Sequence, residues 1–172
     1  MTGFEAIPET PLLAGIPGED WPEILNVGTR VHLGKGEALF LQDEPTNDLY
    51  VVLSGFVRVS VRARSGETDL AQLGPGSIVG EMSFLLGGGR SASVRTSEAS
   101  ELLRISNAAF QQILDGRSKV AFQVLYNIAR TMAARLRAAD SLVKEISLRP
   151  GQSGAEEPDL VDLRRAFYTG TG

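Results

Sequence analysis

Residues 75–94 read PGSIVGEMSFLLGGGRSASV. Gly80 and the glycines at 87–89 allow the backbone to curl, so that several N–H groups point at one cluster of oxygen atoms. The residues between these glycines predict one short helical turn, whose N-terminus favours negative charge. Arg90 supplies a planar fork of donors that matches a phosphate, and Ser91 adds a hydroxyl group. The segment therefore predicts a cradle for a small anion.

Glu81 differs in chemistry from the rest of the segment, because a carboxylate does not bind a phosphate. Beside a phosphate site, a carboxylate usually accepts hydrogen bonds from a neutral group such as a ribose hydroxyl. The simpler alternative is an ordinary glycine-rich turn between two strands, with Arg90 solvated. Composition alone does not separate these two interpretations, and the order of the residues carries the additional information.

The run GEMSFLL at 80–86, followed by RSA at 90–92, resembles the phosphate-binding cassette of the cyclic nucleotide-binding domain family, which includes the bacterial catabolite activators. The resemblance implies that Glu81 holds the ribose 2′-hydroxyl and that Arg90 and Ser91 hold the cyclic phosphate. It also implies that backbone groups line the pocket. The predicted ligand-binding residues of the cassette are Gly80, Glu81, Met82, Ser83, Arg90, Ser91 and Ala92.

Gly89 departs from the family pattern, which usually has a proline or a polar residue before the arginine. This glycine is expected to loosen the loop when no ligand is bound, without removing a ligand contact. In that state we expect Arg90 to be hydrated, so that replacing it hardly changes folding.

Short strands separated by turn signals are predicted from Arg30 to Ile105, with no helix between them. This spacing favours a mainly β fold, an antiparallel β-roll or jelly roll of about eight strands, with a short N-terminal helix and a long C-terminal helix. Several of these segments also resemble the family's β-roll. One departure is the turn at 42–44, where we expect Asp43 to adopt a left-handed conformation. The predicted strands are 30–33, 38–41, 49–53, 56–61, 69–73, 78–79, 92–96 and 101–105.

The composition excludes several functional classes. The chain has 172 residues, no cysteine and a single histidine, His32, in a predicted strand. A cupin-type jelly-roll enzyme needs a cluster of His and carboxylate metal ligands, and a catalytic triad needs a suitably placed His. We therefore expect no enzymatic activity, no metal and no cofactor. The net charge of −4 argues against DNA binding, and the lack of a long apolar run or signal peptide predicts a cytoplasmic protein without membrane contact.

The chain divides into four predicted parts. An N-terminal arm at 1–19 is rich in Pro and Gly, and the β-roll follows at 20–115, with its cassette at 76–94. Asp20 is predicted to cap the short first helix, and Ser106 to cap a helix at 107–114. A long helix is predicted at 116–148, and a linker with a short amphipathic tail at 149–172.

The long helix carries an apolar stripe in steps of three and four residues. Its first half is expected to dock on the β-roll, with Arg135 among the basic residues on its other faces. Its second half is expected to pair with a second copy in a homodimer, as family members do. The stripe consists of Leu125, Ile128, Met132, Leu136, Ala139, Val143 and Ile146.

The tail at 160–168 has apolar residues on one side, namely Leu160, Leu163, Phe167 and Tyr168. Three alternatives remain open for it: docking on its own protein, hanging free, or serving as a short motif for a partner. The 25 residues after Ser147 are too few for the helix-turn-helix that follows the long helix in catabolite activators. The resemblance thus predicts a sensor without an attached DNA reader.

The predicted function is that of a stand-alone cAMP sensor. Ligand binding closes the cassette and repositions a helix hinge near 115–118, which changes the surface offered to an unidentified effector protein. Alternatives are a sensor of cGMP, a sensor of cyclic di-GMP, or a nucleotide-blind β-roll that serves as a dimerisation or scaffold module. Asp140 supports the cGMP alternative, because the resemblance places it where catabolite activators read the base, and a carboxylate accepts both donors of the guanine edge. Asp140 has a simpler alternative role on a solvated helix face.

Overall fold

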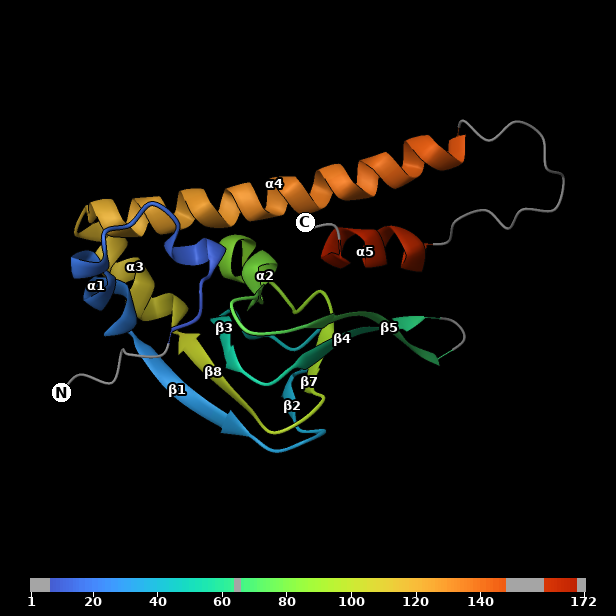
Figure 1. Ribbon diagram of the computed structural model, residues 1–172, viewed down its shortest axis with the longest axis horizontal. Helices are drawn as coiled ribbons and strands as arrows, with labels where there is room; N and C mark the ends of the chain where they lie inside the picture. The colour runs from blue at the N-terminus through green and yellow to red at the C-terminus, as the bar shows by residue number, and fades with distance from the viewer. Residues whose placement is uncertain (1–6, 64–65, 148–159, 170–172) are drawn as a thin grey trace, which may run out of the picture.

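The computed structural model describes residues 7–63, 66–147 and 160–169. These residues form two four-stranded antiparallel sheets, with the strand orders β1-β8-β3-β6 and β2-β7-β4-β5 (Figure 1). The strands are β1 (Gly28–Leu33), β2 (Ala38–Phe40), β3 (Leu49–Ser54), β4 (Val57–Ala63), β5 (Gly66–Leu73), β6 (Ile78–Val79), β7 (Ser93–Thr96) and β8 (Ser100–Ile105). The helical elements are η1 (Pro11–Leu13), η2 (Gly18–Asp20), α1 (Trp21–Leu25), α2 (Glu81–Leu86), α3 (Asn107–Asp115), α4 (Lys119–Ser147) and α5 (Leu160–Thr169).

The predicted fold class is confirmed, since an antiparallel β-roll is followed by a long helix. The largest difference from the predicted strands is in the β4–β5 hairpin, whose strands extend further towards the turn. Asp43 has a φ of 69°, so its predicted left-handed conformation is confirmed. Asp20 precedes α1 but makes no side-chain capping bond, because it lies in right-handed helical backbone at the end of η2. The predicted Ser106 cap is confirmed by its bond from the Ala109 N–H.

β3 is buried on both of its faces and separates two hydrophobic cores. Because side chains alternate along a strand, Leu49 and Val51 point into one core, whereas Tyr50 and Val52 point into the other. The first core lies between this sheet and the helices. The second lies between the two sheets and forms the interior of the β-roll, and Val79 of the cassette belongs to it.

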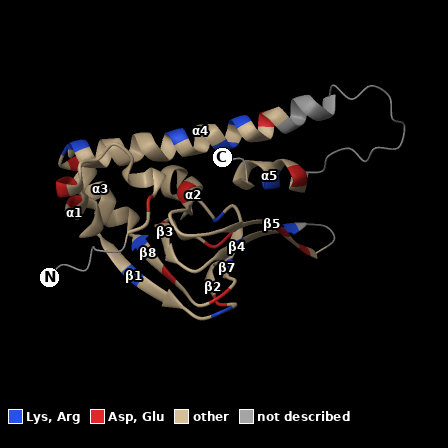
Figure 2. Cartoon of the chain, viewed as in Figure 1, with Lys and Arg blue, Asp and Glu red and all other residues tan. Residues whose placement is uncertain are grey.

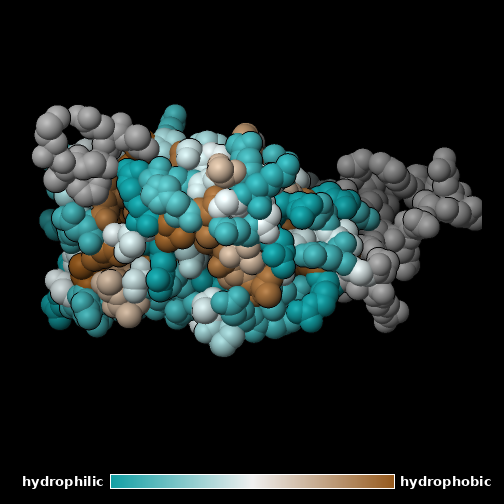
Figure 3. Space-filling model, turned by 90° about the horizontal axis from the view of Figure 1, so that it is seen from below, coloured by the Kyte–Doolittle hydropathy of each residue, from teal (hydrophilic) through white to brown (hydrophobic). Residues whose placement is uncertain are grey.

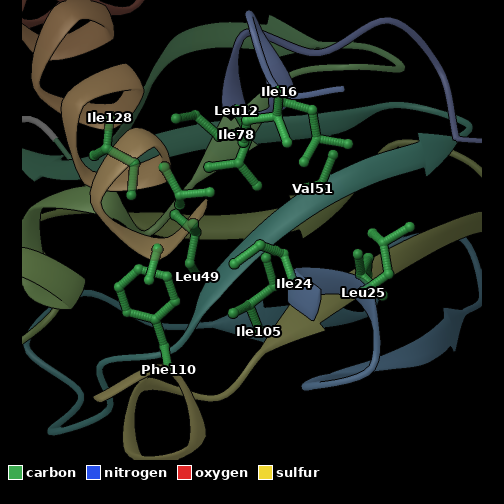
Figure 4. Packing of buried hydrophobic residues seen from close by; sticks show 14 of the residues in the cluster. Leu12, Ile16, Ile24, Leu25, Leu49, Val51, Ile78, Ile105, Phe110 and Ile128 are labelled. Carbon is green, nitrogen blue, oxygen red and sulfur yellow. The ribbon is translucent and has the colours of Figure 1, made fainter. Parts of the chain in front are cut away.

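The first core joins the N-terminal arm, the sheet and the start of α4 (Figure 4). Leu12 and Ile16 of the arm, Phe110 of α3 and Ile128 of α4 are buried against the strands. Asn127 of α4 also donates hydrogen bonds to the carbonyls of Leu12 and Ala14, at 2.9 and 2.8 Å. The arm and α4 are therefore fixed to each other over the end of the β-roll.

α4 runs across the molecule beyond the first core (Figure 1), and Lys and Arg residues lie along its length (Figure 2). Its buried positions form a stripe along one side of the helix and include three polar residues. The expectation that Arg135 lies on another face of the helix is wrong, because this stripe carries Arg135 inward, where it is 2% exposed. Leu136 is 57% exposed, and the side chains of Val143 and Ile146 lie outside the described residues. The buried stripe consists of Val120, Ala121, Val124, Asn127, Ile128, Thr131 and Arg135.

α5 packs between α4 and β5, so the tail docks on its own protein (Figure 1). Tyr168 is 7% exposed and joins the core between the two sheets. Figure 3 shows one face of the molecule, on which hydrophobic residues lie in separate patches among hydrophilic ones. Within the described ranges, no helix has the length and apolar character needed to cross a membrane.

Candidate functional site

The cassette begins with a sharp turn between β6 and α2. Gly80 has a φ of 86°, a left-handed conformation that side chains disfavour. A Cβ atom on Gly80 would lie 2.5 Å from Arg90 Nη1 and 2.8 Å from the carbonyl oxygen of Asp48. Glycine is therefore required at this position both for the backbone and for the close approach of the arginine.

Arg90 is held in place by groups from three segments of the chain. Its Nε donates to Thr46 Oγ1 at 2.8 Å, and its Nη1 donates to Ser83 Oγ and to the carbonyl of Asp48, both at 2.8 Å. Its guanidinium carbon also lies 4.1 Å from the centroid of the Phe40 ring. These contacts orient the guanidinium before any ligand arrives.

Arg90 is only 1% exposed, and burial lowers its pKa. The expectation that it is hydrated without a ligand is therefore wrong. The physical reason is that the turn after β2 and the end of β6 enclose the side chain and supply protein acceptors in place of water. Its Nη2 remains buried without a hydrogen-bond partner among the described residues.

Glu81 is also buried, with 1% of its surface exposed, and it forms an ion pair with Arg135 of α4. Arg135 Nη1 donates to Glu81 Oε1 at 2.5 Å, and its Nη2 donates to the carbonyl of Ile78 at 3.1 Å. Glu81 Oε2 has no partner among the described residues, so one oxygen of the carboxylate is still available. The ion pair links the start of the cassette directly to the long helix.

Seven cassette residues predicted from the sequence line one cavity, which also includes Phe40, Val79, Val94 and Tyr168. Tyr168 comes from α5 and forms a side-chain hydrogen bond with Ser91. Its burial, with Glu81 nearby, raises the pKa of Tyr168, so the phenol is neutral at ordinary pH. The predicted residues that the cavity brings together are Gly80, Glu81, Met82, Ser83, Arg90, Ser91 and Ala92.

Asp140 does not join this group in the structure. It is exposed on α4, more than one helical turn beyond Arg135, and it does not line the cavity. Its assignment to base recognition stays a prediction. Within the described residues, no group of three His, Cys, Asp or Glu side chains is placed to hold a metal ion.

Besides the apolar residues that line the cavity, sequence reasoning missed four residues that supply polar contacts to the site. Thr46 and Asp48 lie in the turn before β3, and nothing in their local pattern indicates that they meet Arg90. Arg135 had a readable signal, since it continues the apolar stripe of α4 by one more step of four from Thr131. Tyr168 was placed on an apolar face, but the surface that this face covers was not predictable.

A second cavity of about 500 Å³ lies between the N-terminal arm, the turn before β6 and α4. Arg130 and Arg135 both line it, together with Asn127 and Thr131. Arg135 thus lies between the two cavities. The cassette contributes only Gly76, Ser77 and Ile78 to this second cavity, and none of its predicted ligand-binding residues lines it.

Among known proteins with similar sequences, two are named for cyclic AMP. A cyclic AMP receptor protein of Thermus thermophilus is 36% identical over 132 residues, which are 76% of this chain and 59% of that protein. A CRP-like cAMP-activated global transcriptional regulator of Mycobacterium tuberculosis is 27% identical over 145 residues, which are 83% of this chain and 62% of that protein. The chain therefore spans less than two thirds of the length of these relatives.

Solved structures show the same architecture. The catabolite activator protein of Thermus thermophilus has a TM-score of 0.72 and 34% identity, over 80% of this chain and 63% of that one. The N-terminal domain of a transcriptional regulator from Streptomyces coelicolor has a TM-score of 0.66 and 28% identity, over 86% of this chain and 99% of that one. The family model described as the cyclic nucleotide-binding domain matches residues 30–117, which contain the whole cassette. The chain therefore belongs to the cyclic nucleotide-binding domain family.

Proposed function

We propose that this protein is a cAMP sensor that changes conformation when nucleotide binds and thereby regulates a partner protein. The observation that supports this most strongly is a pair of unpaired polar atoms at one cavity, the donor Arg90 Nη2 and the acceptor Glu81 Oε2. A buried polar atom without a partner costs about 1–3 kcal/mol, so native structures rarely keep one. A cyclic nucleotide carries both missing partners, because its phosphate accepts from Arg90 and its ribose hydroxyl donates to Glu81.

The ion pair between Glu81 and Arg135 provides a route from the nucleotide to α4. Oε1 of the carboxylate faces Arg135, and Oε2 is available for the ribose hydroxyl. A ligand hydroxyl that donates to Oε2 shifts the position of the carboxylate that Arg135 contacts. Nucleotide binding thereby biases the position of the long helix, which is the element that a partner meets.

cAMP is the proposed ligand because the relatives with the most similar sequences include proteins named for cAMP. cGMP is the alternative that rests on Asp140, and the structure without ligand gives that residue no contact with the cavity. Cyclic di-GMP is a further alternative, and the second cavity with its two arginines is the place where we would expect it.

The exposed side of α4 supports a homodimer. Five residues in steps of four and three are exposed along it, which is the spacing of a coiled-coil seam. Two alanines near its middle would allow two helices to approach closely. Asp140 continues this seam by one more step of four, so that it would face the second copy. The seam consists of Phe122, Tyr126, Ala129, Ala133 and Leu136.

Calorimetric titration of the full chain tests the proposal, with cAMP, cGMP and cyclic di-GMP as ligands and non-cyclic 5′-AMP as the matched control. We expect cAMP to bind with one site per chain and 5′-AMP to bind much more weakly. If cyclic di-GMP alone binds, we would infer that the ligand site is the second cavity. The absence of binding by all three cyclic nucleotides, both in wild type and in a variant with Tyr168 replaced by alanine, would contradict the proposed function and favour a nucleotide-blind scaffold.

A further inference from the structure

The cavity at the cassette is already filled by the protein's own C-terminal helix. Tyr168 lines it together with Glu81 and Arg90, and the free volume that remains is about 10 Å³. A single water molecule needs about 10–15 Å³ of such space. A nucleotide therefore has no room in the cavity while Tyr168 is in place.

α5 also contacts polar groups of the site that a bound nucleotide would contact. Arg164 donates to the carbonyl oxygen of Ser91, and Tyr168 forms a side-chain hydrogen bond with the same residue. The Arg135 guanidinium, which holds Glu81, lies 5.3 Å from the Tyr168 ring and 5.9 Å from the Phe167 ring. α5 thus contacts Ser91 and Arg135, and its Tyr168 lies near enough to Glu81 for that carboxylate to raise the pKa of the phenol.

We propose that α5 is an internal competitor for the nucleotide site, so that the docked helix and the bound nucleotide exclude each other. This inference rests on the proposed function of the cassette. Nucleotide binding releases α5, and the docked helix keeps the cassette closed to weak or non-specific ligands. A lid that closes over the nucleotide would need a cavity beneath Tyr168, and the structure leaves almost no volume there.

The competitor role has a quantitative consequence for affinity. When only a fraction of the molecules has the site open, the apparent Kd equals the intrinsic Kd divided by that fraction. If α5 is docked in about nine molecules of ten, its removal strengthens binding about tenfold. Weakening the docking must therefore tighten nucleotide binding, whereas weakening a lid would loosen it.

The first test is the affinity of the full chain for cAMP after replacing Tyr168 with alanine. We expect the apparent Kd to fall about tenfold or more. Thr169→Ala is the matched control, because Thr169 is exposed on the same helix and its hydroxyl bonds only to the Arg165 carbonyl among the contacts described. Arg164→Ala is a second variant, which removes the bond to Ser91 without opening the core, and it should also tighten binding.

The second test follows α5 directly with a fluorophore on Thr169→Cys, in a chain that otherwise has no cysteine. Saturating cAMP should lower the fluorescence anisotropy as the helix is released, and the same label in an Arg90→Ala background should show no change. Unchanged or higher anisotropy in a protein that binds cAMP would overturn the competitor role and leave the proposed function intact.

The measured cAMP affinities of wild type and of the α5 variants also distinguish failure of the competitor role from failure of the proposed function. Equal or weaker cAMP binding by both α5 variants would also refute the competitor role. Binding by Tyr168→Ala but not by wild type would support it most strongly. If neither protein binds cAMP, cGMP or cyclic di-GMP, the proposed function fails, and the competitor role fails with it.

Discussion

Replacing Arg90 with alanine is expected to weaken both folding and cAMP binding, and the two effects have separate causes. The folded protein loses three hydrogen bonds of 2.8 Å, to Thr46, Ser83 and the Asp48 carbonyl. It also loses the packing of the guanidinium over the Phe40 ring. Each acceptor left unpaired costs about 1–3 kcal/mol when buried.

Part of that loss is offset, because the variant no longer buries a charged group whose burial lowers its pKa. We therefore expect the free energy of unfolding to fall by about 2–4 kcal/mol, within the range for breaking a buried hydrogen-bond network. cAMP binding should weaken by about 2–5 kcal/mol, the cost of truncating one partner of a desolvated charge pair. That change in free energy corresponds to about 30-fold or more in Kd.

Urea unfolding and calorimetric titration measure the two quantities. Arg62→Ala is the matched control, since its side chain is 72% exposed and its carboxylate partner on Asp43 lies 4.0 Å away. The control should change stability by less than about 0.5 kcal/mol and leave binding unchanged. An Arg90→Ala protein as stable as wild type would refute the anchoring network. One that binds cAMP within about threefold of wild type would refute phosphate binding by this residue.

Four further changes test other parts of the site. Gly80→Ala should lose at least about 1 kcal/mol of stability in urea unfolding and should weaken cAMP binding, because a Cβ meets Arg90 Nη1 at 2.5 Å and the φ is positive; an unaffected protein would contradict the tight turn. Removing the ribose 2′-hydroxyl from cAMP should weaken calorimetric binding by about 1–3 kcal/mol, since Glu81 Oε2 loses its donor; equal affinity would show that this carboxylate serves only Arg135. Leu136→Glu, at a position 57% exposed, should give a monomer in analytical ultracentrifugation with its β-roll intact; a wild-type protein that is already monomeric at about tens of micromolar would remove the proposed dimer. If the Asp140 carboxylate accepts hydrogen bonds from guanine, Asp140→Ala should weaken cGMP binding by about 1–3 kcal/mol and leave cAMP binding unchanged. Equal effects on the binding of both nucleotides would show that Asp140 lies on a solvated face without contact to the base.

The β-roll could be predicted because its signals are local. β-branched residues alternate in segments such as 57–61, and glycines separate the strands. The cassette residues also follow one another in the chain, so their order alone indicates a shared site. The run LYVVL at 49–53 is apolar throughout, and the structure explains this by its burial on both faces.

The contacts that complete the site were not predictable in the same way, because they join residues far apart in the chain. Thr46 and Asp48 meet Arg90 across more than 40 residues, through a turn whose sequence has no signal for that contact. Arg135 was misplaced because the stripe predicted from the sequence ran through Met132 and Leu136, whereas the buried stripe runs one residue earlier, through Thr131 and Arg135. The buried Glu81 supplies the charge that makes the burial of Arg135 possible.

The docking of α5 was one of three alternatives for the tail and depends on shape as well as on hydrophobicity. Its apolar side chains were evident from the sequence, but their target is a cavity formed by both sheets and the cassette, and α4 packs beside α5. Tyr168 fits there because its ring fills the space and its hydroxyl reaches Ser91. The fit of Tyr168 to this cavity depends on the three-dimensional arrangement of distant residues, so the order of residues in the tail does not predict it.

A crystal structure of the full chain grown with cAMP tests the central claim most directly. The account predicts one nucleotide in the cassette cavity, with its phosphate at Arg90 Nη2 and Ser91, and its ribose hydroxyl at Glu81 Oε2. Tyr168 should have left the cavity in that structure. A nucleotide bound elsewhere, or a cavity still filled by Tyr168 in protein saturated with cAMP, would contradict the account.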